Sequence, residues 1–140
     1  MDTLRKFVNN DHFARHLGIE MLDYGPGHAR AKMEIGKDHL NSAGTVHGGA
    51  IFSLADAVFS AASNSHGTLA VAINVSISFF KAARSGTLIA EGREVSMNPR
   101  LATYLIDVKD QDGNAMALFQ GTVYRKKESL KEVLEGTSDK

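Results

Sequence analysis

Two residue types are missing from this 140-residue sequence, which contains no cysteine and no tryptophan. Without cysteine the chain has neither a disulfide framework nor thiolate chemistry, so the cytosol is the expected compartment. Without tryptophan it lacks the strongest aromatic anchor for a protein interface. Its six histidines show no spacing typical of metal ligands, so neither a metal nor another cofactor is expected.

Net charge is absent as well, because 16 lysines and arginines balance 16 aspartates and glutamates. A neutral chain gives no reason to expect nucleic acid or an anionic membrane as a partner, and a small molecule is more plausible. No apolar run approaches the roughly 18 residues of a membrane span. The first residues, MDTLRKFVNNDHF, also lack the apolar stretch of a signal peptide, so we expect a cytoplasmic protein.

Hydrophobic periodicity predicts a single domain, residues 1–127, in which two strands precede one long helix and four strands follow it. Residues 2–16 are predicted to form a short amphipathic helix, and residues 128–140 a charged tail that is frayed or disordered. The long helix falls in TVHGGAIFSLADAVFSAASNS, residues 45–65. The predicted strands are IEMLDY, HARAKMEI, LAVAINVSISFF, TLIAEGREVSM, LATYLIDVKD and AMALFQGTVYRK, the last two joined by the turn DQDGN.

The long helix is apolar on nearly every side, so other elements must cover it. The antiparallel strands are the available cover, which predicts an α+β fold with a curled antiparallel sheet wrapped around one long central helix. At about 3.6 residues per turn, one narrow polar stripe remains on this helix. Its members are Ser53, Asp56, Ser60 and Ser63.

Asp56 is the single carboxylate of the long helix. It could be a solvated residue on an exposed stripe, an interpretation that also explains Ser60 and Ser63. Its large apolar neighbours favour a different interpretation, because burial among them pushes the pKa of a carboxylate upward. A carboxylate with a raised pKa is suited to act as a general base near neutral pH.

Two glycines, Gly48 and Gly49, follow His47 where the long helix begins. They could be no more than a flexible helix start. Alternatively, they let a ligand approach the first helical amides, which point outward and can stabilise an oxyanion. Gly48 and Asp56 are eight residues apart, about 12 Å along a helix axis, which is too far for one carbonyl to touch both. Either one of them takes no part in the reaction, or Asp56 acts on a carbonyl that is bound by the Gly48 of a second chain.

The stretch NSAGTVHGGAIFSLAD, Asn41 to Asp56, resembles the signature of hotdog-fold acyl-CoA thioesterases of the phenylacetate-degradation (PaaI) type, in the 4-hydroxybenzoyl-CoA thioesterase-like superfamily. The likeness covers most of the chain and includes NVSISFFKAARSG and AMALFQGTVYR. It implies a hotdog fold, homodimers whose sheets join edge to edge, often assembled into homotetramers, and active sites at the dimer interface. The implied reaction is hydrolysis of an acyl-CoA thioester to a free carboxylic acid and CoA.

The resemblance also implies roles for single residues. Asp56 would act as the general base on water or as the nucleophile. The N–H of Gly48 would bind the thioester oxygen, Asn41 would assist from the same side, and His47 would shape the loop.

The sequence departs from the family at one position and leaves the phosphate contacts of CoA weakly defined. Where some relatives hold the attacking water with serine or threonine, this chain has Ala72, with Asn74 and Ser76 nearby. Three basic residues fall on segments that could meet the CoA phosphates: Lys81, Arg84 and Arg100.

Two other functions are compatible with the sequence. A hotdog dehydratase or hydratase of hydroxyacyl thioesters would pair a histidine with an acid across the interface, as His47 and Asp56 could. A non-catalytic acyl-CoA-binding module is the second alternative; such regulators usually carry a DNA-binding segment, for which neither terminus has the length or the basic charge. The sequence does not distinguish between aryl-acetyl, short-chain and medium-chain acyl groups.

Overall fold

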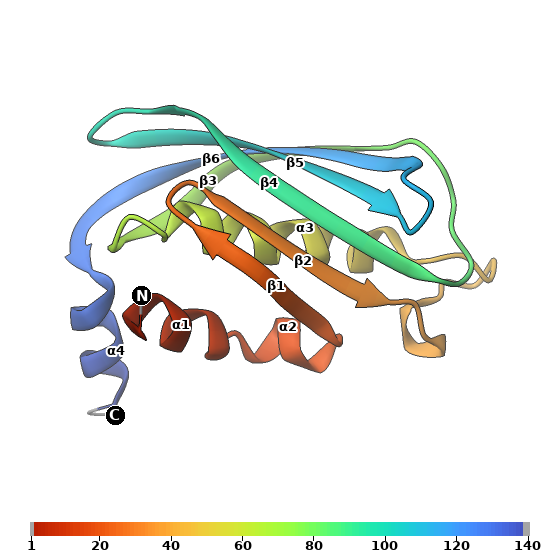
Figure 1. The fold of residues 1–140 in the computed structure, drawn as a ribbon, viewed down its shortest axis with the longest axis horizontal. Coiled ribbons are helices and arrows are strands. Elements are labelled where there is room, and N and C mark those ends of the chain that lie inside the picture. Colours follow the sequence, from red (N-terminus) through yellow and green to blue (C-terminus); the bar gives the residue numbers. More distant parts are fainter. Residues whose placement is uncertain (1, 139–140) are drawn as a thin grey trace.

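A curled antiparallel sheet around one central helix is the main feature of the computed structural model, which describes residues 2–138 (Figure 1). The central helix is α3 (Gly48–Ser63). The strands are β1 (Ile19–Gly25), β2 (His28–Glu34), β3 (Thr68–Phe79), β4 (Thr87–Met97), β5 (Leu101–Asp110) and β6 (Ala115–Ser129). Their order in the sheet is β1-β2-β4-β5-β6-β3, with every neighbouring pair antiparallel. The predicted α+β architecture and the six predicted strands are therefore confirmed.

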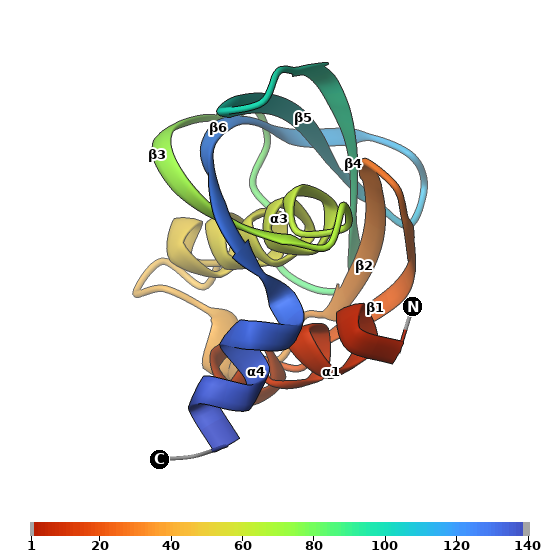
Figure 2. The same cartoon turned by 90° about the vertical axis from the view of Figure 1, so that its left-hand side faces the viewer.

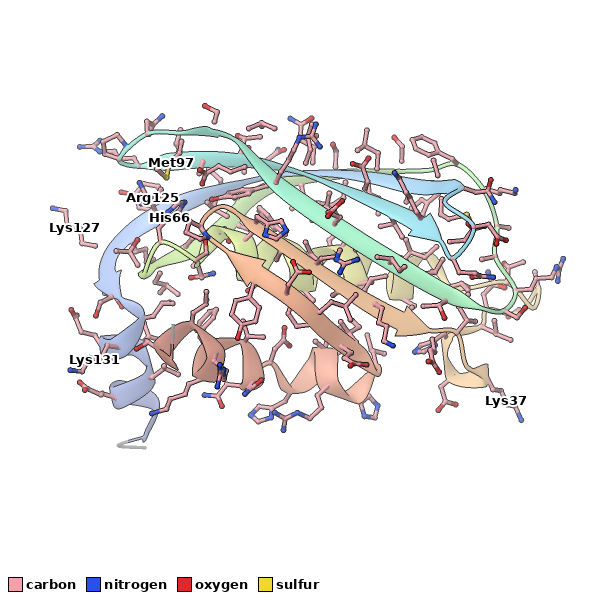
Figure 3. All side chains as sticks on the ribbon, in the orientation of Figure 1. Lys37, His66, Met97, Arg125, Lys127 and Lys131 are labelled. Carbon is pink, nitrogen blue, oxygen red and sulfur yellow. The ribbon has the colours of Figure 1, made fainter. Side chains whose placement is uncertain are left out.

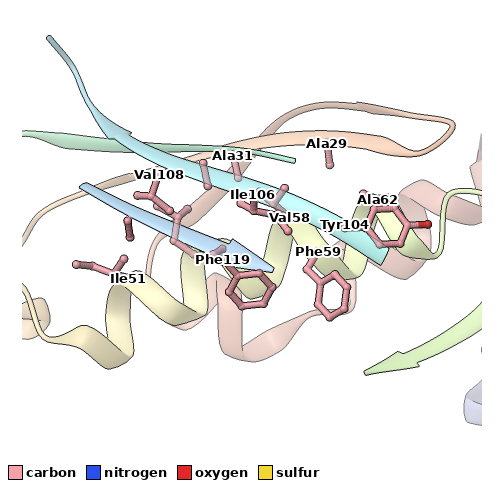
Figure 4. Close-up of a cluster of buried hydrophobic side chains, with 14 of the residues drawn as sticks. Ala29, Ala31, Ile51, Val58, Phe59, Ala62, Tyr104, Ile106, Val108 and Phe119 are labelled. Carbon is pink, nitrogen blue, oxygen red and sulfur yellow. The ribbon is translucent and has the colours of Figure 1, made fainter. Parts of the chain in front are cut away.

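The core lies between α3 and the concave face of the sheet. Leu54 and Val58 of α3 are fully buried, and the ring of Phe59 lies 5.4 Å from that of Phe119 and 5.9 Å from that of Tyr104, centroid to centroid (Figure 4). Tilted and edge-on ring pairs of this kind stabilise the fold beyond their buried area. Alternate residues of β2 are also fully buried, as the alternation predicts: Ala29, Ala31 and Met33.

Two glycines allow the sheet to approach α3 closely. A Cβ atom at Gly92 of β4 would lie 2.7 Å from Val58 Cγ1, and one at Gly121 of β6 would lie 2.6 Å from Phe59 Cζ. Both distances are shorter than real Cβ contacts, so any side chain at these positions would push the sheet away from the helix. The tight wrapping of α3 therefore depends on both glycines.

The N-terminal region forms two helices, where the sequence predicted one over residues 2–16. They are α1 (Asp2–Asn9) and α2 (His12–His16). The break has a local cause, because Asp11 caps α2: its Oδ1 accepts a hydrogen bond of 3.0 Å from the N–H of Ala14. Asparagine and aspartate side chains compete for backbone hydrogen bonds in this way and favour caps over helix interiors.

The C-terminal region forms a packed helix, whereas the sequence predicted a frayed or disordered tail. Strand β6 continues to Ser129, and α4 (Leu130–Ser138) follows. Leu130 is 1% exposed, and its N–H donates a hydrogen bond of 2.9 Å to the carbonyl of Gly67. Leucine and valine at helical spacing give α4 one apolar side, which the charged composition obscures. Residues 139–140 of the predicted tail lie outside the described residues, and the domain boundary at residue 127 stays a prediction.

Strand β3 forms one edge of the sheet and leaves apolar side chains uncovered. Ile73 is 58% exposed, Phe79 51% and Phe80 57%. An open strand edge with exposed apolar groups is a surface on which another strand can pair. Within residues 2–138, no helix is long and apolar enough to cross a membrane.

Candidate active site

The polar stripe on α3 is present in the structure, although it is shorter than predicted. Ser53, Asp56 and Ser60 are partly exposed, whereas Ser63 is 3% exposed and donates a hydrogen bond to the carbonyl of Ser60. The hydroxyl of Ser53 donates to the carbonyl of Gly49 at 2.7 Å. The hydroxyls of Ser53 and Ser63 therefore both donate to backbone carbonyls of α3. Asp56 is the ionisable side chain of the stripe.

Asp56 lies in surroundings that favour its neutral form. Burial raises the pKa of its carboxyl above the ordinary value, and the negative charge of Asp11 raises this pKa further. The direction predicted from the sequence is confirmed, whereas the contribution of Asp11 was missed because 45 positions separate it from Asp56 in the chain. Within residues 2–138, no side chain or backbone group is hydrogen bonded to the Asp56 carboxylate. The carboxylate is thus available to bind and activate a water molecule.

The start of α3 leaves one backbone donor available. His47 is the N-cap residue, and its Nδ1 accepts a hydrogen bond of 2.8 Å from the N–H of Gly49. The N–H of His47 itself donates to the carbonyl of His39 at 2.7 Å. The N–H of Gly48 has no partner among the described residues, and it lies at the positive end of the helix dipole.

The Phe79 ring favours a small residue at position 48. A Cβ atom at Gly48 would lie 3.3 Å from Phe79 Cζ, a contact that would force the ring to shift. Phe79 belongs to the exposed edge strand β3, so the start of α3 lies directly beside that edge. Phe79 is not a predicted site residue, since its alternation with Ile77 predicts an ordinary strand residue.

The loop before α3 is held in shape by Asn41. Its Oδ1 accepts hydrogen bonds from the N–H groups of Ala43 and Thr45, at 2.9 and 3.1 Å, and its Nδ2 donates to the hydroxyl of Thr45 at 3.0 Å. The loop is also fastened to the connection after β3, because the N–H of Val46 donates to the carbonyl of Ala83 at 2.8 Å. Asn41 still has one amide hydrogen without a partner among the described residues, so it can both hold the loop and donate to a ligand.

Ala72 and its polar neighbours lie on the open edge strand. The pairing of β3 with β6 shifts between Ala72 and Asn74, which are both exposed, and Ser76 is exposed two residues further on. A β-bulge of this kind redirects side chains locally. Among the described residues, no hydrogen bond or ion pair links Ala72, Asn74 or Ser76 to Asp56.

The three candidate phosphate-binding residues do not gather in one place. Arg84 lies over the Asn41 loop, with Nη1 3.5 Å from the carbonyls of Ala43 and Gly44, and Lys81 belongs to the same connection between β3 and β4. Arg100 lies in the hairpin between β4 and β5, where its carbonyl accepts from the N–H of Arg125. Figure 3 shows Met97, at the end of β4, and Arg125 of β6 at the opposite end of the molecule from Lys37, which begins the short 3-10 helix (Lys37–His39) before the loop.

The candidate site residues therefore fall into two separate groups within one chain. Asn41, His47 and Gly48 cluster at the start of α3, and Asp56 lies two turns further along the same unbroken helix. At a rise of about 1.5 Å per residue, Gly48 and Asp56 are about 12 Å apart along the axis. The constraint deduced from the sequence thus holds in the structure. Within residues 2–138, no group of three or more histidine, aspartate or glutamate side chains is placed to hold a metal ion.

A long helix inside a curled six-stranded antiparallel sheet is the hotdog fold, and here it carries a half-buried carboxylate and an open helical N–H group. The family model of the thioesterase superfamily matches residues 43–117, and the chain belongs to this family. The enzyme class predicted from the sequence, a thioester hydrolase, is confirmed.

Individual relatives agree with this assignment. The chain is 48% identical to a putative esterase of Archaeoglobus fulgidus over 122 residues, covering 86% of this chain and 79% of the relative. It is 35% identical to the acyl-coenzyme A thioesterase PaaI of Escherichia coli over 117 residues, covering 83% and 84%. The solved structure of E. coli PaaI superimposes with a TM-score of 0.88 over 91% of this chain and 94% of that one. A Streptococcus mutans protein solved with acetyl-CoA, 28% identical, superimposes with a TM-score of 0.76 over 79% and 90%.

Proposed function

We propose that the chain hydrolyses an acyl-CoA thioester to a carboxylic acid and CoA, at sites that each combine two copies of the chain. The observation that carries this proposal is the separation of Gly48 and Asp56 on one rigid helix, which prevents them from meeting one carbonyl within a single chain. The substrate class is supported by E. coli PaaI, which bears the name of an acyl-CoA thioesterase, and by the S. mutans structure with acetyl-CoA.

In the proposed reaction the thioester carbonyl oxygen accepts hydrogen bonds from the N–H of Gly48 and the free amide hydrogen of Asn41. Asp56 of the other chain removes a proton from a water molecule as that water attacks the carbonyl carbon. The negative charge that develops on the oxygen is stabilised by both donors. When the tetrahedral intermediate collapses, the carbon–sulfur bond breaks and the thiolate of CoA takes up the proton held by Asp56.

In an alternative mechanism for the same hydrolysis, Asp56 acts as the nucleophile. Its carboxylate would attack the carbonyl carbon and expel CoA thiolate, leaving a mixed anhydride that water then hydrolyses. Both mechanisms need an ionised Asp56 and the same two oxyanion donors, the N–H of Gly48 and the amide of Asn41. Solvent oxygen enters the carboxylate of the protein only in the nucleophilic mechanism, when water attacks the Asp56 carbonyl of the anhydride.

The open edge of β3 is the surface on which we expect two chains to pair. Gly48 lies against Phe79, and the Oδ1 of Asn64 at the other end of α3 accepts from the N–H of Ala70 at 2.9 Å, so α3 and β3 run in opposite directions. Antiparallel pairing of two β3 edges around a twofold axis would therefore place the two α3 helices antiparallel as well. Pairing would also cover the exposed side chain of Ile73.

The proposed pairing constrains the position of the twofold axis. Asp56 of one chain faces Gly48 of the other only when the axis crosses the helix pair midway between these residues, at the level of Phe52. The same rotation carries the β4–β5 hairpin of one chain toward the Asn41 loop of the other. CoA phosphates would then lie between Lys81 and Arg84 of one chain and Arg100 of its partner. Two such dimers would make up the predicted homotetramer.

The dehydratase alternative is less well supported because His47 already serves as a helix cap. Its Nδ1 accepts from Gly49, and the ring would have to give up this bond in order to reach a substrate from that nitrogen. A purely binding module would not need a half-buried carboxylate that has no hydrogen-bond partner among the described residues. Cytoplasmic localisation stays a prediction.

The direct test of the proposed function is the release of free CoA thiol from a panel of acyl-CoA substrates with aryl-acetyl, short and medium acyl groups. We expect thiol release with at least one member. Enoyl absorbance from hydroxyacyl-CoA substrates without thiol release would support the dehydratase instead, and binding without either signal would support a non-catalytic module.

The pH dependence should reflect the surroundings of Asp56. Only the ionised carboxylate can act, so we expect kcat to fall on the acid side at a pH above the pKa of about 3.9 of an unperturbed aspartate. Asp11→Asn removes one cause of the raised pKa and keeps an oxygen to cap α2. The acid limb should therefore move to lower pH in this variant. Stopped assays of kcat between pH 4 and 8 would measure the shift. An acid limb at the same pH as in the wild type would show that Asp11 does not influence the catalytic carboxylate.

A further inference from the structure

A cavity of about 610 Å³ lies alongside α3 and is not used by the mechanism above. It is bordered by α1, α2, β1 and α4 together with α3, and Figure 2 shows α1 and α4 side by side near the central helix. From β1 it is lined by Ile19 and Met21. Its volume falls within the roughly 300–1,000 Å³ typical of small-molecule sites.

One end of this cavity adjoins Asp56. Ala57 and Ser60 line the cavity from α3; the first directly follows Asp56, and the second lies one helical turn further along the same stripe. Asp11 lines it from the junction between α1 and α2, and Asp11 is close enough to Asp56 to raise its pKa. A group attached to a carbonyl carbon beside Asp56 therefore has this cavity next to it.

Nine of the fifteen lining residues are apolar. The polar ones are Asn9, Asn10, Asp11, His12, Arg15 and Ser60. Because they include no lysine and one arginine, the cavity suits an uncharged acyl group better than a nucleotide phosphate. From α3 the lining residues are Ala57, Ser60 and Ala61, whose small side chains leave space beside the helix. The apolar lining residues include Phe7, Val8, Ala61, Val133 and Leu134.

The far wall is formed by α4, which lies outside residues 43–117 matched by the family model. The N–H of Leu130 is bonded to the carbonyl of Gly67, in the turn that follows α3, and the Leu130 side chain is buried. Helix α4 also packs against α1. These contacts fix α4 at the end of the cavity that lies beyond the end of α3, so Val133 and Leu134 stand where a long substituent would stop.

We propose that this cavity binds the acyl group of the substrate and that Val133 and Leu134 set the longest acyl group that the enzyme accepts. The inference rests on the proposed function and makes it more specific: the substrates are thioesters of uncharged aryl-acyl or medium-chain acyl groups. Acetyl-CoA would leave the far end of the cavity empty and would be a poor substrate.

The test is kcat/KM for a homologous series of straight-chain acyl-CoA substrates together with phenylacetyl-CoA. For the wild type, each added methylene should raise kcat/KM by about three- to fourfold until the cavity is full, and longer chains should then lose rate. Val133→Phe fills the far end and should move the optimum to shorter chains by two or more carbons. Leu134→Ala enlarges it and should move the optimum to longer chains. Glu135→Phe adds the same ring to α4 outside the lining and should leave the profile unchanged.

Each outcome decides between the two proposals. If no member of the series is hydrolysed, the proposed function is wrong and this inference is wrong with it. If the wild type hydrolyses the series but Val133→Phe and Leu134→Ala keep the wild-type optimum, the acyl group binds elsewhere and only this inference is overturned. Far-UV circular dichroism and thermal unfolding of each variant confirm that α4 is still folded, so an unmoved optimum counts against the proposal.

Discussion

Asp56→Asn should lower kcat by about two orders of magnitude or more, as expected for loss of a general base or nucleophile. Asparagine keeps the size of the side chain and its half-buried position on α3, but it cannot take a proton from water. The measurement is CoA thiol release under saturating substrate. Ser53→Ala, on the same stripe, is the matched control and should retain most of the wild-type rate.

The same substitution should make the fold more stable at neutral pH. Burial and Asp11 raise the pKa of Asp56 in the folded state, so ionisation of this carboxyl opposes folding. The stability that protonated Asp56 contributes is fully present below the pKa of this carboxyl in the unfolded chain. It is lost as the pH rises through the raised pKa of the carboxyl in the folded chain. A neutral asparagine avoids this loss, and thermal unfolding at pH 7 should show a higher Tm than wild type. A folded variant that keeps most of its thioesterase activity would remove Asp56 from the mechanism.

Asn41→Ala should lower the rate by roughly ten- to a thousandfold, less than Asp56→Asn, because loss of one oxyanion donor costs a few kcal/mol of transition-state stabilisation. The structure adds a complication, since Asn41 also holds the loop through the N–H groups of Ala43 and Thr45. Kinetics of Asn41→Ala alone would not separate these two roles.

Asn41→Asp separates them. Aspartate keeps an oxygen that accepts from the N–H groups of Ala43 and Thr45, so the loop retains these two hydrogen bonds, but it has no amide hydrogen to donate to the substrate. If Asn41 stabilises the oxyanion, Asn41→Asp should be at least as slow as Asn41→Ala. If Asn41 serves only the loop, Asn41→Asp should recover the wild-type kcat across the acyl panel.

The features predicted most reliably from the sequence are those set by local pattern. Alternation in HARAKMEI placed Ala29, Ala31 and Met33 in the core, and the apolar circumference of α3 required a sheet around it. The position of Asp56 on a narrow polar stripe and the direction of its pKa follow from helix geometry and burial alone. Its distance from Gly48 along the axis follows from the fixed rise per residue of a helix.

Features that depend on contacts distant in sequence were missed or only partly predicted. Asp11 reaches the surroundings of Asp56 through the packing of two short helices, which no periodicity encodes. Helix α4 is charged on most of its surface, and only its buried contact with the turn after α3 reveals its role. The Phe79 ring against Gly48 is a third case, because it depends on how an edge strand passes the start of a helix.

The central claim is that each active site takes Asp56 from one chain and Gly48 with Asn41 from another, and mixed dimers test it most directly. Asp56→Ala and Asn41→Ala chains, each inactive or nearly so alone, are unfolded together and refolded. In a mixed dimer with shared sites, one site collects both substitutions and the other has none. With random pairing half of the dimers are mixed and half of their sites are intact, so CoA release should return to roughly a quarter of the wild-type rate. Mass spectrometry of the intact dimers verifies that chains have exchanged, and verified exchange without recovery of activity would contradict the shared-site account.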